Sequence, residues 1–276
     1  MSVPTLTLAH GAEMPQIGLG TSPMDDAATE RVVAQALERG YRLVDTAENY
    51  RNEEGVGRGL VASGVPREQV FVTTKFNKRW HGVKEARQAC ERALERLGVD
   101  YLDLFLIHWP NPGQDRYVDA FAGLIELREK GLIRAAGTSN FKPAHIDRVI
   151  AGTGQAPEVN QIQLNPFVAR EGPRTYAAAH GIVTESWSPF GGGKAEVLRH
   201  PTVVEIAERV SRLPAQVVLR WNVQLGLVAI PKSSDPGRLE SNLDVFDFEL
   251  SAPDMAALSA LDKGEAAAAD SDVSGH

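Results

Sequence analysis

Short apolar runs alternate along the chain with longer segments whose apolar residues recur at helical spacing. Eight of the short runs have the length and composition of buried strands. They are Ile17–Gly20, Arg42–Val44, Val70–Thr74, Leu102–Ile107, Ile133–Thr138, Val159–Leu164, Ile182–Glu185 and Leu227–Ile230. Such alternation favours repeated β-α units around a parallel sheet. Eight units predict the α/β fold class, as a (β/α)8 or TIM barrel.

The helical patterns lie between these runs and after the last one. They cover Ala27–Arg39, Glu53–Ala62, Val83–Leu97, Val118–Lys130, Pro143–Ile150, Gly172–Ala179, Thr202–Val210, Pro214–Gln224 and Arg238–Val245. Two of them, Thr202–Val210 and Pro214–Gln224, lie between the seventh and the eighth strand, so one of the two is predicted to be an extra helix outside the repeat. The segment Pro253–Leu261 is a second extra helix.

Both ends of the chain depart from the repeat. The stretch TLTLAHGAEMPQI alternates around His10–Gly11, which predicts a β-hairpin that caps one mouth of the barrel. Residues 264–276 are small, acidic and polar, and are expected to form a loosely held surface tail. No repeat or linker divides the rest, so residues 1–276 are predicted to form one domain.

Composition narrows the classes of function. The chain has 276 residues, of which 43% are hydrophobic and 24% charged, and its formal net charge is −7, so it offers no basic surface for nucleic acid. The N-terminal stretch has neither a basic region nor a continuous apolar one, and no run approaches the ~18 apolar residues of a membrane span. These features predict a cytoplasmic protein without a membrane partner. The single cysteine, Cys90, lies on an apolar helix face and is expected to be a buried, inert thiol.

Polar side chains follow three consecutive predicted strands. Asp45, Lys75 and His108 come directly after strands two, three and four. Each has an ordinary explanation taken alone: an aspartate often caps a helix, a lysine is usually solvated, and a histidine can be a satisfied barrel-end residue. However, a charged group at the end of a buried strand is costly unless it is paired. Because these strand ends converge on one mouth, they predict a shared site there.

Nine short motifs in order then connect the chain to a known family. They are GLGT at 18–21, DTAENY at 45–50, NEE at 52–54, VTTK at 72–75, IHWP at 107–110, GTSNF at 137–141, NQIQLNP at 160–166, WSPFG at 187–191 and IPKSSDPGRLESN at 230–242. Together they resemble the aldo-keto reductases, and among these the small bacterial enzymes related to 2,5-diketo-D-gluconate reductase. The resemblance spans nearly the whole chain.

The resemblance implies a catalytic tetrad of Asp45, Tyr50, Lys75 and His108. Hydride transfer to a carbonyl carbon leaves negative charge on the oxygen, which then needs a proton and prearranged donors. Tyr50 would supply the proton, with its pKa lowered by Lys75, and Asp45 would hold Lys75. His108 would donate a hydrogen bond to the substrate oxygen. The resemblance places the substrate against Tyr50, Asn77, His108 and Trp109.

The resemblance also implies NADPH or NADP+ as the coenzyme and no metal. No strand-linked G-x-G-x-x-G is present, which disfavours a Rossmann site. The nicotinamide would stack on Trp187, its carboxamide would meet Ser139, Asn140 and Gln161, and the 2′-phosphate would meet Lys232, Ser233 and Arg238. The complete set of expected coenzyme residues is Gly20, Thr21, Asp45, Ser139, Asn140, Gln161, Trp187, Ser188, Pro189, Phe190, Gly191, Lys232, Ser233, Ser234, Arg238 and Asn242.

These features predict a monomeric, metal-independent oxidoreductase that interconverts small aldehydes or ketones, including diketones and sugar-derived carbonyls, with alcohols. Two other classes stay open. One is a non-catalytic dinucleotide-binding subunit on the same barrel, and the other is a barrel lyase or isomerase in which Lys75 forms a Schiff base. The chain departs from the family pattern at Arg51, Gln163 and Asn165, which bear on the polarity of the mouth, and at Ser241, which stands where many relatives have a glutamate that contacts adenine.

Overall fold

The computed structural model describes residues 3–276 and confirms the predicted barrel. Eight parallel strands follow one another in chain order from β3 to β10. They are β3 (Leu19–Gly20), β4 (Leu43–Asp45), β5 (Phe71–Phe76), β6 (Leu102–Ile107), β7 (Ile133–Ser139), β8 (Val159–Gln163), β9 (Val183–Trp187) and β10 (Val228–Ala229). The sheet closes where Ile17 forms a parallel bridge with Ala229, since Gly18 N donates to Ala229 O at 2.9 Å.

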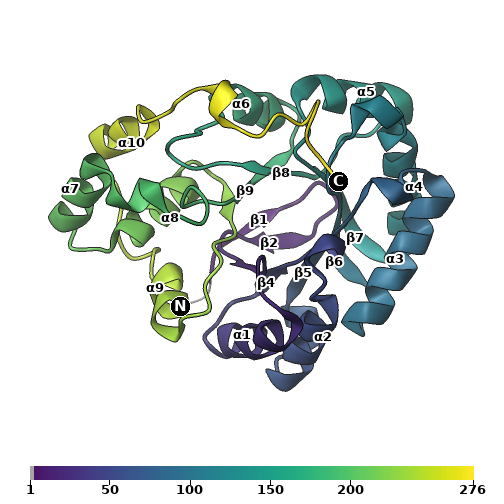
Figure 1. Ribbon diagram of the computed structural model, residues 1–276, viewed down its shortest axis with the longest axis horizontal. Coiled ribbons are helices and arrows are strands. Elements are labelled where there is room, and N and C mark those ends of the chain that lie inside the picture. The colour runs from purple at the N-terminus through teal and green to yellow at the C-terminus, as the bar shows by residue number, and fades with distance from the viewer. Residues whose placement is uncertain (1–2) are drawn as a thin grey trace.

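Ten α-helices in the described residues surround these strands (Figure 1). They are α1 (Asp26–Glu38), α2 (Glu53–Ala62), α3 (Val83–Leu97), α4 (Tyr117–Glu129), α5 (Pro143–Thr153), α6 (Glu171–Ala179), α7 (Pro201–Arg209), α8 (Pro214–Gln224), α9 (Pro236–Leu243) and α10 (Ala252–Ser259). As predicted, two helices, α7 and α8, precede β10, and α10 lies beyond the repeat. None of the helices within residues 3–276 combines the length and apolarity needed to cross a membrane.

The N-terminal hairpin closes the mouth at which the strands begin. Its strands β1 (Thr5–Thr7) and β2 (Glu13–Pro15) pair antiparallel around the predicted turn. Met14 is fully buried and packs in one apolar cluster with Leu43 and Phe71, which lie at the starts of β4 and β5. The carboxyl ends of the strands are therefore left to form the opposite mouth.

Strand β5 is longer than its sequence pattern predicts, and the difference matters for the site. The apolar run ends at Thr74, whereas β5 continues through Lys75 to Phe76. Side chains alternate along it, so Thr74 reaches outward to a helix residue while Lys75 points into the barrel. A buried lysine can occupy a strand interior here because oxygen atoms surround its ammonium group.

Candidate active site

Asp45, Lys75 and Tyr50 meet at the carboxyl end of the barrel, as predicted. The Lys75 Nζ atom donates to Asp45 Oδ1 at 2.6 Å, to the Thr46 carbonyl at 2.9 Å and to the Tyr50 hydroxyl at 3.4 Å. The side chains of Lys75 and Asp45 are 0% and 2% exposed. A charged pair that is removed from water this completely needs such saturated hydrogen bonding.

A short 3-10 helix, η1 (Glu48–Tyr50), returns the chain so that Tyr50 faces Lys75. It ends at Arg51, whose φ of 56° lies in the left-handed region. The next residue, Asn52, is fully buried; its side chain donates to the Thr21 and Met24 carbonyls and accepts from Thr46 Oγ1 at 2.8 Å. Asn52 thus fixes the loop that carries Tyr50. Within the sequence it read only as part of the NEE motif.

Burial and charge act in opposite directions on these groups. Burial alone would lower the pKa of Lys75, but the Asp45 carboxylate and the Tyr50 hydroxyl outweigh it, so the pKa of Lys75 lies above its usual value. For Tyr50 the balance goes the other way: burial raises the pKa above its usual value, although Lys75 opposes the rise. The predicted effect of Lys75 on Tyr50 therefore has the right direction, because Lys75 lowers the Tyr50 pKa. The burial of Tyr50, which the sequence did not reveal, has the larger effect and raises the net pKa.

His108 stands beside this trio at the end of β6. Its ring centroid lies 5.9 Å from that of Tyr50, in an edge-to-face arrangement. Burial, with the nearby Lys75 charge, holds the pKa of His108 well below its usual range, so the imidazole is neutral. A neutral imidazole still carries one N–H that can be donated to an oxygen in the mouth.

The residues predicted to meet the nicotinamide form one hydrogen-bonded chain. Trp187 Nε1 donates to Asn140 Oδ1 at 2.9 Å, and Asn140 Nδ2 donates both to Ser139 Oγ and to the His108 carbonyl at 3.0 Å. Ser139 Oγ donates to the Gln161 carbonyl at 3.0 Å. Asn140 has a φ of 64°, and its side chain lies between the ends of β6 and β9, where it contacts the His108 carbonyl and Trp187 Nε1. These residues connect His108 to Trp187 across β6 to β9.

Gln161 joins these hydrogen-bonded residues directly to Asp45 of the tetrad, and it also contacts Glu185, a residue that sequence reasoning missed. Gln161 Nε2 donates to Asp45 Oδ2 at 2.8 Å and to Glu185 Oε2 at 2.7 Å. Glu185 is fully buried. It stood at the end of the seventh predicted strand, as Asp45 follows the second, but it lies in no motif singled out above. A carboxyl group at the end of a predicted strand was the feature of the sequence that could have identified Glu185 as a site residue.

The remaining expected coenzyme residues lie on two loops and on α9. The residues Ser188, Pro189, Phe190 and Gly191 follow Trp187 directly, and Gly191 has a φ of 83°. Lys232, Ser233 and Ser234 follow β10, Arg238 lies in the first turn of α9, and Asn242 is buried on the same helix.

These loops adjoin the tetrad through β3. Thr21 Oγ1 donates to the Asp45 carbonyl at 3.0 Å. Gly20 N donates to the Pro231 carbonyl at 3.1 Å, and a Cβ atom on Gly20 would come within 3.0 Å of the Ile230 carbonyl. Glycine at this position leaves room for the close approach of β3 to the segment that carries Lys232.

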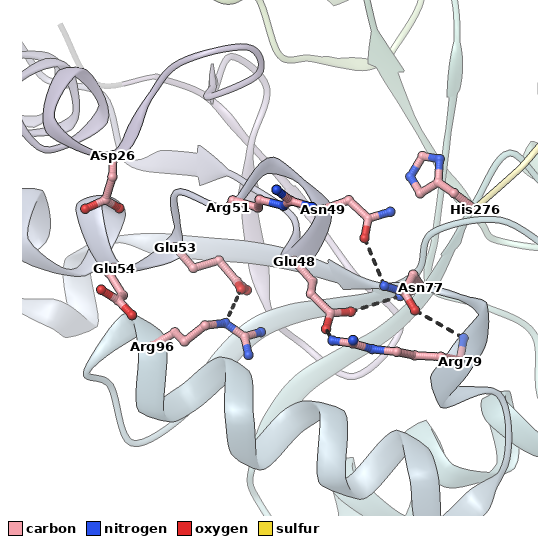
Figure 2. A pocket seen from close by; sticks show the side chains of 10 residues that line it. All are labelled: Asp26, Glu48, Asn49, Arg51, Glu53, Glu54, Asn77, Arg79, Arg96 and His276. Carbon is pink, nitrogen blue, oxygen red and sulfur yellow. Dashed lines mark hydrogen bonds and ion pairs between the residues drawn. The ribbon is translucent and has the colours of Figure 1, made fainter.

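Beside the mouth lies a charged cavity of about 910 Å³. The tetrad does not line it. Its lining consists of Asp26, Glu48, Asn49, Arg51, Glu53, Glu54, Asn77, Arg79, Arg96 and His276 (Figure 2). Asn77, the predicted substrate residue, donates to Asn49 Oδ1 at 2.9 Å and accepts from Arg79 N at 3.1 Å. Glu53, the first residue of α2, is 2% exposed; it accepts from Thr74 and pairs with Arg96.

The C-terminal tail, predicted to be a loosely held segment, forms ion pairs at the carboxyl mouth of the barrel. Lys142 Nζ lies 2.6 Å from Asp270 and 2.5 Å from Asp272, and His145 Nε2 lies 2.9 Å from Asp272. In Figure 1 the tail runs from α10 past α6 to the end marked C, above and to the right of the centre of the view. Asp270 and Asp272 of the tail thus supply carboxylates to Lys142, directly before α5, and to His145 on α5.

The last residues of the tail lie on the predicted substrate residues. The His276 ring centroid is 4.6 Å from that of His108 and 6.2 Å from that of Trp109. Gly275 has a φ of 139°, and a Cβ atom there would approach Trp109 Cβ to 2.9 Å. His276 also lines the charged cavity (Figure 2), so it stands where the cavity meets the mouth.

The chain is similar to known proteins in both sequence and structure. Residues 14–263 match the model of the aldo/keto reductase family. An aldo-keto reductase of Mycolicibacterium vanbaalenii is 50% identical over 263 residues, which are 95% of this chain and 94% of that protein. A mutant of Gox0644, solved in complex with NADPH, is 41% identical with a TM-score of 0.94 and full coverage of both chains. A Bombyx mori aldo-keto reductase in complex with NADP is 33% identical, with a TM-score of 0.88 and coverage of 95% and 94%.

Proposed function

Since the chain belongs to the aldo/keto reductase family of oxidoreductases, we propose that it reduces small aldehydes or ketones to alcohols with NADPH, and that Tyr50 donates the proton. The observation that carries this proposal is the buried contact of Lys75 with both Asp45 and Tyr50, at 2.6 and 3.4 Å. The protein would act as a monomer on a small-molecule carbonyl substrate.

The protonation states of the site suit carbonyl reduction. Burial raises the pKa of Tyr50, so its hydroxyl keeps the proton at neutral pH and can donate it. Lys75 opposes that shift by favouring the tyrosinate that is left behind, which lowers the cost of giving up the proton. Asp45 keeps Lys75 charged and in place. The neutral His108 would donate its N–H to the same substrate oxygen.

The residues around Trp187 fit a nicotinamide coenzyme, which when bound supplies the hydride. The Trp187 ring is half-buried beside Asn140, and Ser139, Asn140 and Gln161 present amide and hydroxyl groups to a carboxamide. Lys232 and Arg238 are exposed cations, and neither forms an ion pair with another described residue. Ser233 lies between them in the sequence and is buried. Two cations and a hydroxyl suit the dianionic 2′-phosphate of NADPH. The NADPH and NADP complexes of the two structural neighbours support this assignment.

The other two classes fit the geometry less well. A non-catalytic dinucleotide-binding subunit would need neither the Lys75–Tyr50 contact nor the buried pair beneath it. A Schiff-base enzyme requires an unprotonated lysine with room to attack a carbonyl. Lys75 is instead held as an ammonium group by three oxygen acceptors and lies beneath Tyr50.

Replacement of Tyr50 by phenylalanine tests the proposal. The variant keeps the ring and loses one hydroxyl, so packing and NADPH affinity should change little. Turnover should fall by ~10² to 10⁴-fold, the range that general acid catalysis contributes, and the loss should appear in kcat. The measurements are NADPH consumption with a panel of aldehydes, diketones and sugar-derived ketones, and NADPH titration by fluorescence quenching. Carbonyl reduction within a few-fold of the parent would contradict the role of Tyr50.

A further inference from the structure

Glu185 is a buried carboxyl group that the proposed mechanism does not use. It lies on β9 and is fully buried inside the barrel. Its register partner on β8 is Gln161, whose own partner on β7 is Ser139. Paired residues of adjacent parallel strands point to the same face, so the three side chains form one row across the interior. Trp187 lies two residues beyond Glu185 on the same strand and the same face.

The position of Glu185 determines how the Gln161 amide is turned. The amide nitrogen has two hydrogens, and both are used: one reaches Asp45 Oδ2 at 2.8 Å and the other reaches Glu185 Oε2 at 2.7 Å. A planar amide that is held at its nitrogen by two acceptors cannot rotate by 180° without placing its oxygen against both of them. Gln161 Oε1 is therefore directed away from the two carboxyl groups.

The second oxygen of Glu185 indicates that this group acts without a charge. Glu185 Oε1 is buried and has no hydrogen-bond partner among the described residues. An ionised carboxylate with one bare oxygen is costly to bury, and Lys75, the cation that acts on Glu185 within residues 3–276, is already paired with Asp45. Burial, together with the Asp45 charge, raises the pKa of Glu185 to about 8. At neutral pH the site thus holds one ion pair and one neutral acid.

We infer that Glu185 is a positioning residue for the coenzyme: by accepting from the Gln161 amide nitrogen, it aims the Gln161 oxygen at the amide N–H of a nicotinamide carboxamide. This inference rests on the proposed function. Asp45 alone would occupy one hydrogen of the Gln161 amide and leave the other without a partner in the barrel interior. Glu185 supplies that second acceptor without adding a second negative charge next to Lys75.

The test compares NADP+ with its 3-acetylpyridine analogue, which has a methyl ketone in place of the carboxamide and so lacks the N–H that Gln161 would accept. Dissociation constants are measured by tryptophan quenching for the parent, Glu185→Met and Glu185→Gln. Methionine keeps the length but removes the acceptor. In this variant NADP+ should bind roughly 2- to 12-fold more weakly, the worth of one neutral hydrogen bond, while the analogue should change less than twofold. Glutamine is neutral and retains a carbonyl acceptor, so Glu185→Gln should keep the parent affinity for both ligands within about twofold.

The outcomes separate this inference from the function beneath it. A parent that binds neither NADP+ nor NADPH would overturn the proposed function and the inference with it. A parent that binds, with equal weakening of both ligands in Glu185→Met, would show a general packing effect and overturn the inference alone. If Glu185→Met does not fold, Glu185→Gln decides: a loss of more than about fivefold for NADP+ but not for the analogue would show that a neutral acceptor does not suffice.

Discussion

Two lysine–aspartate contacts of nearly the same length have very different surroundings. Inside the barrel, Lys75 Nζ lies 2.6 Å from Asp45, and the two side chains are 0% and 2% exposed. At the edge of the mouth, Lys142 Nζ lies 2.6 Å from Asp270, and the side chains are 34% and 55% exposed. The first pair lies beneath Tyr50, and the second fastens the C-terminal tail.

The difference shows that the distance between two charged groups does not by itself determine how much their ion pair contributes to the free energy of folding. Water screens the exposed pair, so its formation changes the free energy of the fold very little. The buried pair has given up hydration on both sides, and each partner depends on the other to make its charge tolerable. The buried pair is therefore suited to fixing a protonation state, and the exposed pair to holding a segment that can be released.

The largest effect is expected from removal of the buried cation. Lys75→Met leaves Asp45 without its partner inside the barrel, and the free energy of unfolding should fall by about 3 to 5 kcal/mol at neutral pH. The pKa of Tyr50, already raised by burial, should rise further because the opposing charge is gone. The alkaline limb of alcohol oxidation should accordingly move to higher pH. Urea unfolding and a pH–rate profile are the two measurements.

A double variant is the control for this experiment. Asp45→Asn combined with Lys75→Met removes both charges, so the unfolding free energy should recover much of the loss while turnover stays low. If the single Lys75 variant were as stable as the parent, the buried contact would not be the interdependent pair described above.

An intermediate effect is expected at Arg238, an exposed cation whose partner would be a ligand. A charge-assisted hydrogen bond contributes ~1.5 to 3 kcal/mol, so Arg238→Ala should weaken NADPH binding roughly 10- to 150-fold. NADH lacks the 2′-phosphate and should bind about as it does to the parent. Titration by fluorescence quenching measures both affinities. Arg31→Ala, at an exposed arginine on α1, is the matched control and should leave both unchanged.

An equal loss of affinity for NADPH and NADH in the Arg238 variant would show that this residue does not contact the 2′-phosphate. Arg238 would then resemble Lys142, a partly exposed cation whose removal is expected to have a small effect.

The buried region was largely predictable from sequence, because hydrophobic burial leaves a periodic pattern. The apolar runs located all eight barrel strands, and the polar residues that ended them located Asp45 and His108. Lys75 was found as a strand-end residue although it lies inside β5, since polar groups that point into a barrel interrupt the same apolar pattern. Glu185 ended its run too, but a pattern does not reveal which carboxyl is ionised, because that depends on neighbours from other strands.

The tail could not be predicted by the same reasoning. Residues 264–276 bury little apolar surface, so no periodic pattern marks their place. Their position depends on contacts of the tail with Lys142 and His145, at the start of α5, and with Trp109. These three residues lie more than a hundred positions earlier in the chain. The net direction of the Tyr50 pKa shift could not be predicted for a related reason. It depends on how deeply the loop that carries Tyr50 is buried, and the spacing of residues in the sequence does not reveal that depth.

The smallest effect is expected at the exposed end of the comparison. Lys142→Met removes the cation that faces Asp270 and Asp272, and stability should not change measurably because exposed pairs are screened. The tail itself should loosen: hydrogen exchange of its amides and the KM for a carbonyl substrate should rise by no more than roughly fivefold. Lys130→Met, which removes a similarly exposed pair with Glu126 on α4, is the matched control and should alter neither.

Acidification should act on the same contact with a defined sign. The Lys142 ammonium group holds the pKa of Asp270 below its usual value. The carboxylate therefore favours the docked tail above its ordinary pKa of 3.8, and this contribution disappears as the pH falls through the lowered value. Tail exchange in the parent should approach that of Lys142→Met only below about pH 4. Should Lys142→Met instead destabilise the protein as much as Lys75→Met, exposure would not be what separates the two pairs, and the tail would belong energetically to the barrel.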